Sequence, residues 1–231
     1  MEWLSIMPEG DLLRIATWNV ERLKHHKDAD SMLCEIKRID ADILVLTETD
    51  SRLLPNYPYH YSTPLLREIR PDYYRQTENR VSVFSKYKCV KQHDTYDKYT
   101  AICVELDTGA GNLLVYGTIM GIFGNREASF KSDLCEQMED IRRLSAQGHS
   151  VCVIGDYNLS FCDNYYYTRY GRDLVDQTFE DCRIDILTRD VTWCIDHIAV
   201  SKSFVNGISS IEEWNHEKTL SDHKGIAVSI S

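Results

Sequence analysis

The alternation of apolar runs with short turns predicts a chain built mainly of buried strands. Residues 12–18 form a first run that ends at Asn19, and residues 43–46 are continuously apolar, as in a strand covered on both faces. The other expected strands are residues 81–85, 101–106, 113–118, 151–154, 195–200 and 226–230. The Gly-containing segment 107–112 should join two of these strands as a hairpin.

Two segments instead show helical spacing. Apolar residues recur every three or four positions at Met32, Leu33, Ile36 and Ile39, and again at Phe130, Leu134, Met138, Ile141 and Leu144. Asp28 or Asp30 is a candidate N-cap of the first helix, and the second should span residues 126–147 and end at Gly148. Many strands with few helices indicate an α/β fold in which sheets pack together and helices lie outside.

The composition is that of an ordinary soluble globular protein. Of 231 residues, 43% are hydrophobic and 27% are charged, which is enough apolar material for a core. We find no linker, repeat or low-complexity tract, so residues 1–231 are expected to form one domain. No run approaches the roughly 20 apolar residues of a membrane span, and no membrane insertion is expected. Residues 1–11 lack the pattern of a secretory signal, which favours a cytoplasmic protein.

The eight cysteines do not indicate a zinc or redox site. None of them forms a Cys-x-x-Cys pair, which is the spacing that defines zinc ribbons and redox motifs. Cys103, Cys152 and Cys194 lie within apolar, strand-like runs. A free cysteine in such a position behaves as a small hydrophobic residue, so reduced structural thiols are expected.

The net charge argues against a protein that coats nucleic acids. The formal charge is −10, whereas proteins that coat nucleic acids are usually basic. Strong non-specific binding to polyanions is therefore not expected. A nuclease is still compatible with this charge, because acidic residues at a metal site lower the net charge while the bound cation reverses its local sign.

Polar residues stand repeatedly where the apolar runs end. They are Asn19 and Glu21, Glu48, Asp156 and Asn158, Asp196 and His197, and Asp222 and His223. A single Asp after a strand is most often a turn or a cap, but five such positions together indicate a site at one edge of a sheet. Grouped carboxylates repel one another without a cation, and oxygen ligands of this kind suit Mg²⁺ or Mn²⁺.

These residues form sequence blocks that resemble the signatures of the endonuclease/exonuclease/phosphatase superfamily. The blocks are Thr17-Trp18-Asn19-Val20-Glu21, Asp42-Ile43-Leu44-Val45-Leu46-Thr47-Glu48, Gly155-Asp156-Tyr157-Asn158, Ile195-Asp196-His197-Ile198 and Leu220-Ser221-Asp222-His223. The superfamily includes deoxyribonuclease I-like nucleases, abasic-site endonucleases, sphingomyelinases, inositol-polyphosphate 5-phosphatases and deadenylases. The resemblance implies a four-layer sandwich, with two packed mixed or antiparallel β-sheets flanked by α-helices and the site at one end.

The resemblance also implies a role for each residue. Glu48 would be the principal metal carboxylate, with Asn19 and Glu21 nearby and Asp222 assisting. Asp156 would orient or deprotonate the attacking water, and Asn158 would donate to a phosphate oxygen. His223, held by Asp196, would contact the phosphate or share in proton transfer. These roles agree with the chemistry, because hydrolysis of a phosphate ester places negative charge on oxygens that a metal and a histidine stabilise.

The sequence departs from the family pattern in two places. The family usually has a His or Tyr facing the site after the strand at 113–116, whereas residues 117–121 contain no titratable side chain. Tyr116 or a neighbouring loop could supply the missing contact, or no residue supplies it. A weaker block, residues 79–85, carries Arg80 where the family usually has Gly.

Basic and aromatic residues near the blocks indicate the substrate. The candidate substrate-binding residues are Arg22, Lys24, His25, Asn79, Arg80 and Tyr165. Such mixtures suit a phosphate backbone with stacked bases, although solvated loops and packed surface tyrosines are an alternative interpretation. The predicted function is a metal-dependent nuclease with nucleic acid as partner and no obligate protein partner. The alternatives are a phosphatase acting on a small metabolite or an inositol phosphate, and a catalytically weak binding protein.

Overall fold

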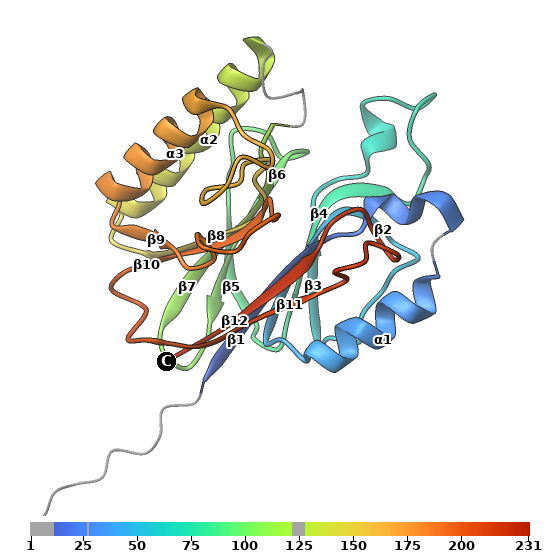
Figure 1. The fold of residues 1–231 in the computed structure, drawn as a ribbon, viewed down its shortest axis with the longest axis horizontal. Coiled ribbons are helices and arrows are strands. Elements are labelled where there is room, and N and C mark those ends of the chain that lie inside the picture. Colours follow the sequence, from blue (N-terminus) through green and yellow to red (C-terminus); the bar gives the residue numbers. More distant parts are fainter. Residues whose placement is uncertain (1–11, 27, 122–127) are drawn as a thin grey trace, which may run out of the picture.

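Two six-stranded sheets pack face to face in the computed structural model, which describes residues 12–26, 28–121 and 128–231 (Figure 1). The first sheet has the strand order β11-β12-β1-β2-β4-β3 and the second has β5-β6-β7-β8-β10-β9. The strands of the first sheet are β1 (Leu13–Asn19), β2 (Ile43–Asp50), β3 (Tyr59–Ser62), β4 (Glu78–Ser85), β11 (Ile208–Trp214) and β12 (Gly225–Ile230). Those of the second are β5 (Cys89–His93), β6 (Ala101–Asp107), β7 (Asn112–Ile119), β8 (Ser150–Asp156), β9 (Ile184–Ile186) and β10 (Asp196–Ser201).

Helices cover the outer faces of both sheets. Helix α1 (Ala29–Ile39) lies against the first sheet, and α2 (Ala128–Ala146) and α3 (Arg169–Asp181) lie together against the second (Figure 1). Each sheet is mixed, because β1 pairs with β2 and β7 with β8 in parallel while the other pairs are antiparallel. The expected four-layer sandwich is confirmed. No helix within the described ranges is both long and apolar enough to cross a membrane.

The core has three parts that follow from these layers. A central cluster of Val, Ile and Leu side chains fills the space between the sheets, with Ile15, Val45 and Val115 fully buried there. A second cluster lies under α2 and α3 and a third under α1. Strands that are covered on both faces therefore read as continuous apolar runs, which is why the sequence pattern located them.

The elements that the sequence pattern missed lie mainly at the edges of the sheets. Strands β3, β5, β9 and β11 were not expected, and neither was α3. Residues 126 and 127 of the predicted second helix lie outside the described residues. Of the two candidate caps for α1, Asp28 takes the role, because its side chain accepts hydrogen bonds from the backbone N–H groups of Asp30 and Ser31.

The topology brings five strand ends to one edge of the sandwich. The carboxyl ends of β1, β2 and β8 meet the amino ends of β10 and β12, because these last two run antiparallel to their neighbours. Asp156 at the end of β8 is the register partner of Asp196 at the start of β10. The polar residues of the five sequence blocks therefore share one location.

Candidate active site

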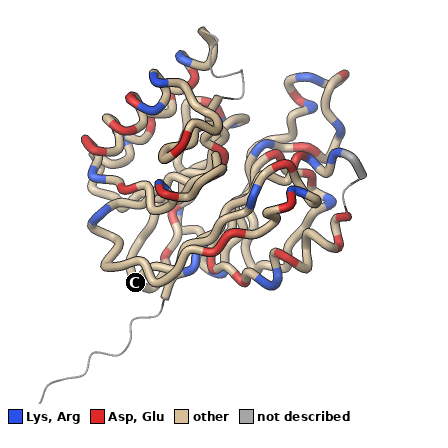
Figure 2. The backbone as a smooth tube through the Cα atoms, in the orientation of Figure 1, with Lys and Arg blue, Asp and Glu red and all other residues tan. Residues whose placement is uncertain are grey.

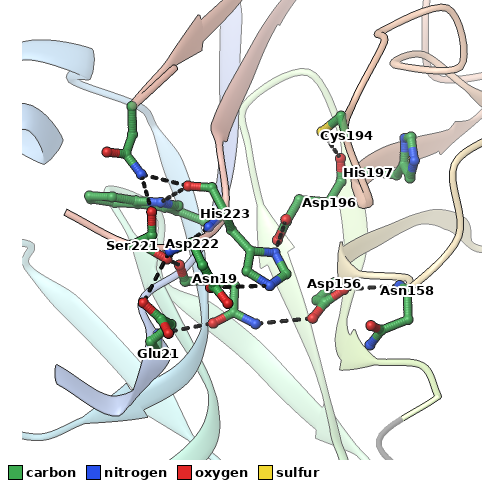
Figure 3. A network of polar contacts seen from close by, with 12 residues as sticks. Asn19, Glu21, Asp156, Asn158, Cys194, Asp196, His197, Ser221, Asp222 and His223 are labelled. Carbon is green, nitrogen blue, oxygen red and sulfur yellow. Dashed lines mark hydrogen bonds and ion pairs between the residues drawn. The ribbon is translucent and has the colours of Figure 1, made fainter. Parts of the chain in front are cut away.

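A hydrogen-bonded chain of side chains joins the two sheets at this edge (Figure 3). Asn19 at the end of β1 donates from Nδ2 to Asp156 Oδ2 at 3.0 Å, and its Oδ1 accepts from the backbone N–H of Glu21 at 3.0 Å. Asn19 and Asp156 are both buried. Asn19 thus fixes one carboxylate oxygen of the second sheet relative to the first.

His223 lies beside this junction and is held from three sides. Its Nδ1 is 2.6 Å from Asp196 Oδ2 (Figure 3), its backbone N–H donates to Ser221 Oγ, and its carbonyl accepts from Trp18 Nε1 at 3.1 Å. Ser221 in turn donates to the carbonyl of Asn19 at 2.6 Å. Groups from β1 and the loop before β12 therefore hold the backbone of His223, and Asp196 on β10 holds its imidazole.

The buried carboxylates and the imidazole shift one another's ionisation. Burial raises the pKa of Asp156, the charge of His223 opposes this and the charge of Asp196 adds to it, and the net result is a pKa of about 7. Burial lowers the pKa of His223, but the charges of Asp196 and Asp156 outweigh this effect and raise it to about 10. At neutral pH the site therefore combines a cationic imidazole with a carboxylate that can take up a proton, which is the pairing that acid–base catalysis needs.

Asn158 follows Asp156 on a strained turn. Its φ is 50°, in the left-handed region, and its backbone N–H donates to Asp156 Oδ1 at 2.9 Å. Its side-chain Nδ2 donates to the carbonyl of Met120 at 2.7 Å, which leaves the second N–H of that amide for another acceptor. Glu48 and Glu21 have positive φ as well. Strained backbone of this kind is characteristic of functional sites, because only a structural or functional demand maintains it.

The carboxylates around the junction fit a divalent cation. Glu48 Oε2 is a buried oxygen that makes no hydrogen bond, and so is Asp196 Oδ1. Ligand atoms of Asp156, Asp196 and His223 also lie within 4.8 Å of one another. The two oxygens accept no hydrogen bond, although Arg22 Nε lies 3.1 Å from Glu48 Oε2, so they can still coordinate an ion and the residues present are compatible with Mg²⁺ or Mn²⁺.

The other predicted metal ligands lie on the Glu21 side of the site. Glu21 is buried and its Oε2 accepts the backbone N–H of Asp222 at 3.0 Å. The Asp222 side chain is 66% exposed, and its Oδ1 is 3.6 Å from His223 Nε2. Both remain predicted ligands; the hydrogen bond places the loop before β12 against the loop after β1.

An open cavity of about 390 Å³ lies over these groups. Its wall is formed by Arg22, Glu48, Leu66, Tyr73, Tyr74, Arg80, Ile119, Gly121, Asp156, Asn158, Tyr166 and His223. The guanidinium of Arg80 is anchored by a hydrogen bond from Nη1 to Thr100 Oγ1 at 2.7 Å. Where the family usually places a His or Tyr, Ile119 contributes an apolar surface.

Several residues that the sequence singled out lie elsewhere. Asn79 is buried and donates to the carbonyl of Val81 and to Ser82 Oγ, so it stabilises β4 and is absent from the cavity wall. Tyr116 points away from the site and donates to Asp140 under α2; it cannot replace the missing family residue. The side chain of His25 lies outside the described part of the structure.

A second cavity on the other side of His223 contains a residue that the sequence analysis overlooked. It has a volume of about 270 Å³ and is lined by Tyr165, Trp193, Lys218 and Lys224, among others. The rings of Tyr165 and Trp193 are 5.3 Å apart, and Lys218 Nζ lies 5.0 Å from the Tyr165 ring and 2.8 Å from its hydroxyl. Trp193 is 62% exposed and lies three residues before Asp196. A tryptophan so close to one of the sequence blocks is the signal that would have identified it.

The charge distribution over the whole fold is mixed. Acidic and basic residues are interspersed along the chain (Figure 2). The basic side chains that matter to the site are those at its two cavities, above all Arg22, Arg80, Lys218 and Lys224.

Comparison with known proteins agrees with this geometry. The model of the endonuclease/exonuclease/phosphatase family matches residues 16–223. The chain belongs to this family. It is accordingly a phosphoester hydrolase by family, and the five sequence blocks that predicted the membership all lie at the edge described above. No match was found among curated proteins.

Solved structures with the same fold include two of NExo and one of a retrotransposon endonuclease domain. The 3′ phosphatase NExo from Neisseria, bound to a product DNA hairpin, has 18% identity and a TM-score of 0.69 over 95% of this chain and 99% of that one. The 3′-5′ exonuclease NExo from Neisseria meningitidis has 16% identity and a TM-score of 0.70 over 95% and 100%. The endonuclease domain of TRAS1, a telomere-specific non-LTR retrotransposon, has 16% identity and a TM-score of 0.71 over 95% and 98%. At these identities the likeness establishes the fold.

Proposed function

We propose that the protein is a Mg²⁺- or Mn²⁺-dependent nuclease that hydrolyses phosphodiester bonds of nucleic acids. The observation that carries this proposal is the arrangement of an aromatic and basic cavity directly beside a buried Asp156–His223–Asp196 group. Exposed aromatic rings beside lysines, here Tyr165 and Trp193 with Lys218, are suited to a base and its phosphate, whereas a small phosphorylated metabolite would need only the polar cavity. The structures of similar fold that act on or bind DNA support the same substrate class.

In this mechanism Asp156 positions the attacking water and accepts its proton. Its two oxygens are already fixed by Asn19 Nδ2 and the backbone N–H of Asn158, so the carboxylate presents a defined direction to the water. Burial raises its pKa to about 7, which makes it a stronger base than an exposed carboxylate. A hydrolytic water therefore meets a base whose position is fixed before the substrate arrives.

His223 and Asn158 act on the phosphate. His223 is held cationic by Asp196, and its Nε2 remains available to donate to a non-bridging or leaving oxygen. Asn158 keeps one N–H for the phosphate. Glu48, with Asn19, Glu21 and Asp222 nearby, would hold the divalent ion, which when bound supplies positive charge to neutralise the developing oxyanion.

The proposal is tested with labelled single- and double-stranded DNA and RNA in the presence of Mg²⁺ or Mn²⁺. We expect cleavage that EDTA abolishes and that Asp156→Asn lowers by about 100-fold or more, since the variant cannot accept the proton. Asp185→Asn, which removes an exposed carboxylate from β9, is the matched control and should keep full activity. Failure to cleave any nucleic acid would overturn the nuclease proposal, and hydrolysis of inositol phosphates instead would establish the phosphatase alternative.

A further inference from the structure

Arg22 occupies a position between the predicted metal carboxylate and the substrate cavity. Its Nε lies 3.1 Å from Glu48 Oε2, and its guanidinium carbon is 5.3 Å from the centroid of the Tyr74 ring. The side chain is only 14% exposed. Arg22 Nε and Glu48 Oε2 are both buried and neither makes a hydrogen bond, so their contact is an ion pair without directional bonding.

The backbone holds Arg22 in this place at a cost. Three successive residues, Glu21, Arg22 and Leu23, have φ values of 48°, 53° and 49°. A side chain in the left-handed region is strained, and glycine is the residue that avoids this strain. Strained backbone of this kind persists at functional sites, so the position of the Arg22 side chain points to a functional role.

The position of Arg22 conflicts with a metal ion at Glu48. Two cations cannot approach the same carboxylate oxygen closely without strong repulsion, because the oxygen is buried and little solvent screens the charges. Arg22 must therefore release Glu48 Oε2 before that oxygen can bind a divalent ion. Lys24 is a weaker competitor, since its Nζ is 3.8 Å from Glu48 Oε2 and its side chain is 41% exposed.

A substrate phosphate provides the alternative partner. Arg22 lines the same cavity as Asp156, Asn158 and His223, which are the groups proposed to act on the phosphate. A guanidinium offers five N–H donors in a planar fork that matches phosphate oxygens. Arg22 contacts Glu48 without a directional hydrogen bond and lies over the Tyr74 ring, so a phosphate in the cavity would give its guanidinium better-directed bonds.

We infer that Arg22 is shared between Glu48 and the substrate phosphate, so that phosphate and metal ion bind cooperatively. This inference rests on the proposed metal-dependent phosphoesterase function. Phosphate draws the guanidinium away and frees the carboxylate for the metal; metal at Glu48 displaces the guanidinium toward the phosphate. The coupling is reciprocal, as thermodynamic linkage requires. Arg22 is therefore a specificity residue that disfavours metal loading in the absence of an anionic substrate.

The test measures Mn²⁺ affinity directly. Mn²⁺ is titrated into the protein and the free ion is followed by electron paramagnetic resonance, with and without inorganic phosphate at a concentration that leaves Mn²⁺ soluble. Wild type is compared with Arg22→Ala and with Arg67→Ala, which removes an exposed arginine from the short helix η2 (Leu66–Glu68) near the same cavity. Binding, not turnover, is the readout.

Without phosphate, Arg22→Ala should bind Mn²⁺ about 5-fold or more tightly than wild type does. The factor by which phosphate increases the Mn²⁺ affinity should be about 5-fold smaller in Arg22→Ala than in wild type. Some coupling should remain, because a phosphate oxygen can itself contact the metal. Arg67→Ala should behave as wild type. Arg22→Gly is a second variant that also relieves the positive φ, so a folded protein without the side chain is obtained even if the Ala variant is unstable.

The outcomes separate this inference from the proposed function. Mn²⁺ binding by Arg22→Ala that is no tighter than wild type, or that keeps the full phosphate effect, would overturn the role of Arg22. Equal effects from Arg67→Ala would overturn it too, because they would show a response to bulk charge. If no variant binds Mn²⁺ with or without phosphate, the proposed metal dependence itself fails.

Discussion

Asp196 determines what His223 can do. Its Oδ2 accepts from His223 Nδ1 at 2.6 Å, while its Oδ1 is buried without a hydrogen bond. The bond fixes the ring tautomer and stabilises the imidazolium, so that Nε2 is the nitrogen left facing the cavity. The same carboxylate raises the pKa of Asp156. One buried side chain therefore adjusts both the acid and the base of the proposed reaction.

Asp196→Asn should lower kcat for nucleic acid cleavage by about 100-fold or more, because an amide stabilises the imidazolium far less than a carboxylate. The fold should be retained, since the substitution preserves the size of the side chain. Steady-state kinetics on a labelled oligonucleotide measure the effect, with Asp185→Asn as control. Unchanged kcat in Asp196→Asn would show that the Asp196–His223 pair has no part in the reaction.

Trp193 should contribute to substrate binding and not to the chemical step. Trp193→Ala is expected to raise KM for single-stranded oligonucleotides by about 5-fold or more, because stacking of one base on an aromatic side chain contributes about 1 to 3 kcal/mol. Its kcat should change little. Val90→Ala, on the edge strand β5, removes a side chain of similar exposure (59% against 62%) and is the control. If KM is unchanged in Trp193→Ala, the second cavity has no role in binding the oligonucleotide.

At the scale of elements, α2 is attached to the strand that ends at the cavity. Thr118 on β7 donates to Gln137 Oε1 at 2.6 Å, and Gln137 Nε2 donates to the carbonyl of Ile119 and to Asp133 Oδ2. Tyr96 donates to the other oxygen of Asp133. This buried network fixes the end of β7 and hence the position of Ile119 in the cavity wall.

Burial raises the pKa of Asp133 to about 6, and the hydrogen bond from Gln137 and the charge of Arg80 oppose this only partly. In the unfolded chain the same carboxyl titrates near 3.8. Between these values the folded protein binds more protons than the unfolded one, so this group makes the free energy of unfolding decrease as pH rises from about 4 to about 6. Below the lower value both states are neutral at this group and the contribution is constant.

Asp133→Asn should remove that decrease. As pH rises from 4 to 7, the free energy of unfolding of the variant should increase by about 1 to 3 kcal/mol relative to that of wild type. Urea denaturation at several pH values in the presence of EDTA measures it. Glu136→Gln, an exposed acid on the same helix, should show no such trend. A difference that stays constant with pH would contradict the raised pKa.

The whole molecule depends on how closely the two sheets approach. Gly117 on β7 faces the interior, where an added Cβ would lie 2.9 Å from Val81 Cγ1 and 3.2 Å from Val45 Cγ1 of the opposite sheet. These distances are shorter than ordinary van der Waals contacts, so the absence of a side chain at this point lets the sheets pack. The hydrogen bond between Asn19 and Asp156 spans the same interface and requires that spacing.

Gly117→Ala should therefore destabilise the protein by about 1 to 3 kcal/mol through overpacking. Gly207→Ala is the matched control, because its Cβ would meet only Ser231 Oγ at 3.5 Å, an ordinary contact. Chemical denaturation measures both. We also expect lower phosphoesterase activity in Gly117→Ala, since separating the sheets moves Asn19 relative to Asp156. Equal stabilities of the two variants would show that the interface accommodates a methyl group.

The sequence by itself determined the buried strands, the family and the residue types of the site. A strand covered on both faces must be continuously apolar, so β1, β2, β7 and β8 left a clear pattern. The polar residues at the ends of β1, β2 and β8 stood out against it. The edge strand β11 is largely exposed and β3 is mostly half-buried, so neither left such a run. Helix α3 buries only a narrow stripe, Gly171, Val175, Thr178 and Phe179, at its otherwise polar surface.

Only the tertiary structure decided which of those residues act together. Whether a side chain faces the cavity depends on partners far away in sequence: Asn79 turned to the backbone of its own strand, Tyr116 to α2, and Trp193 to a cavity shared with Tyr165. The contact of Arg22 with Glu48 is likewise set by the turn after β1 and the end of β2. Local patterns record burial and backbone preference, whereas direction and ionisation arise from groups that folding alone brings within a few ångströms.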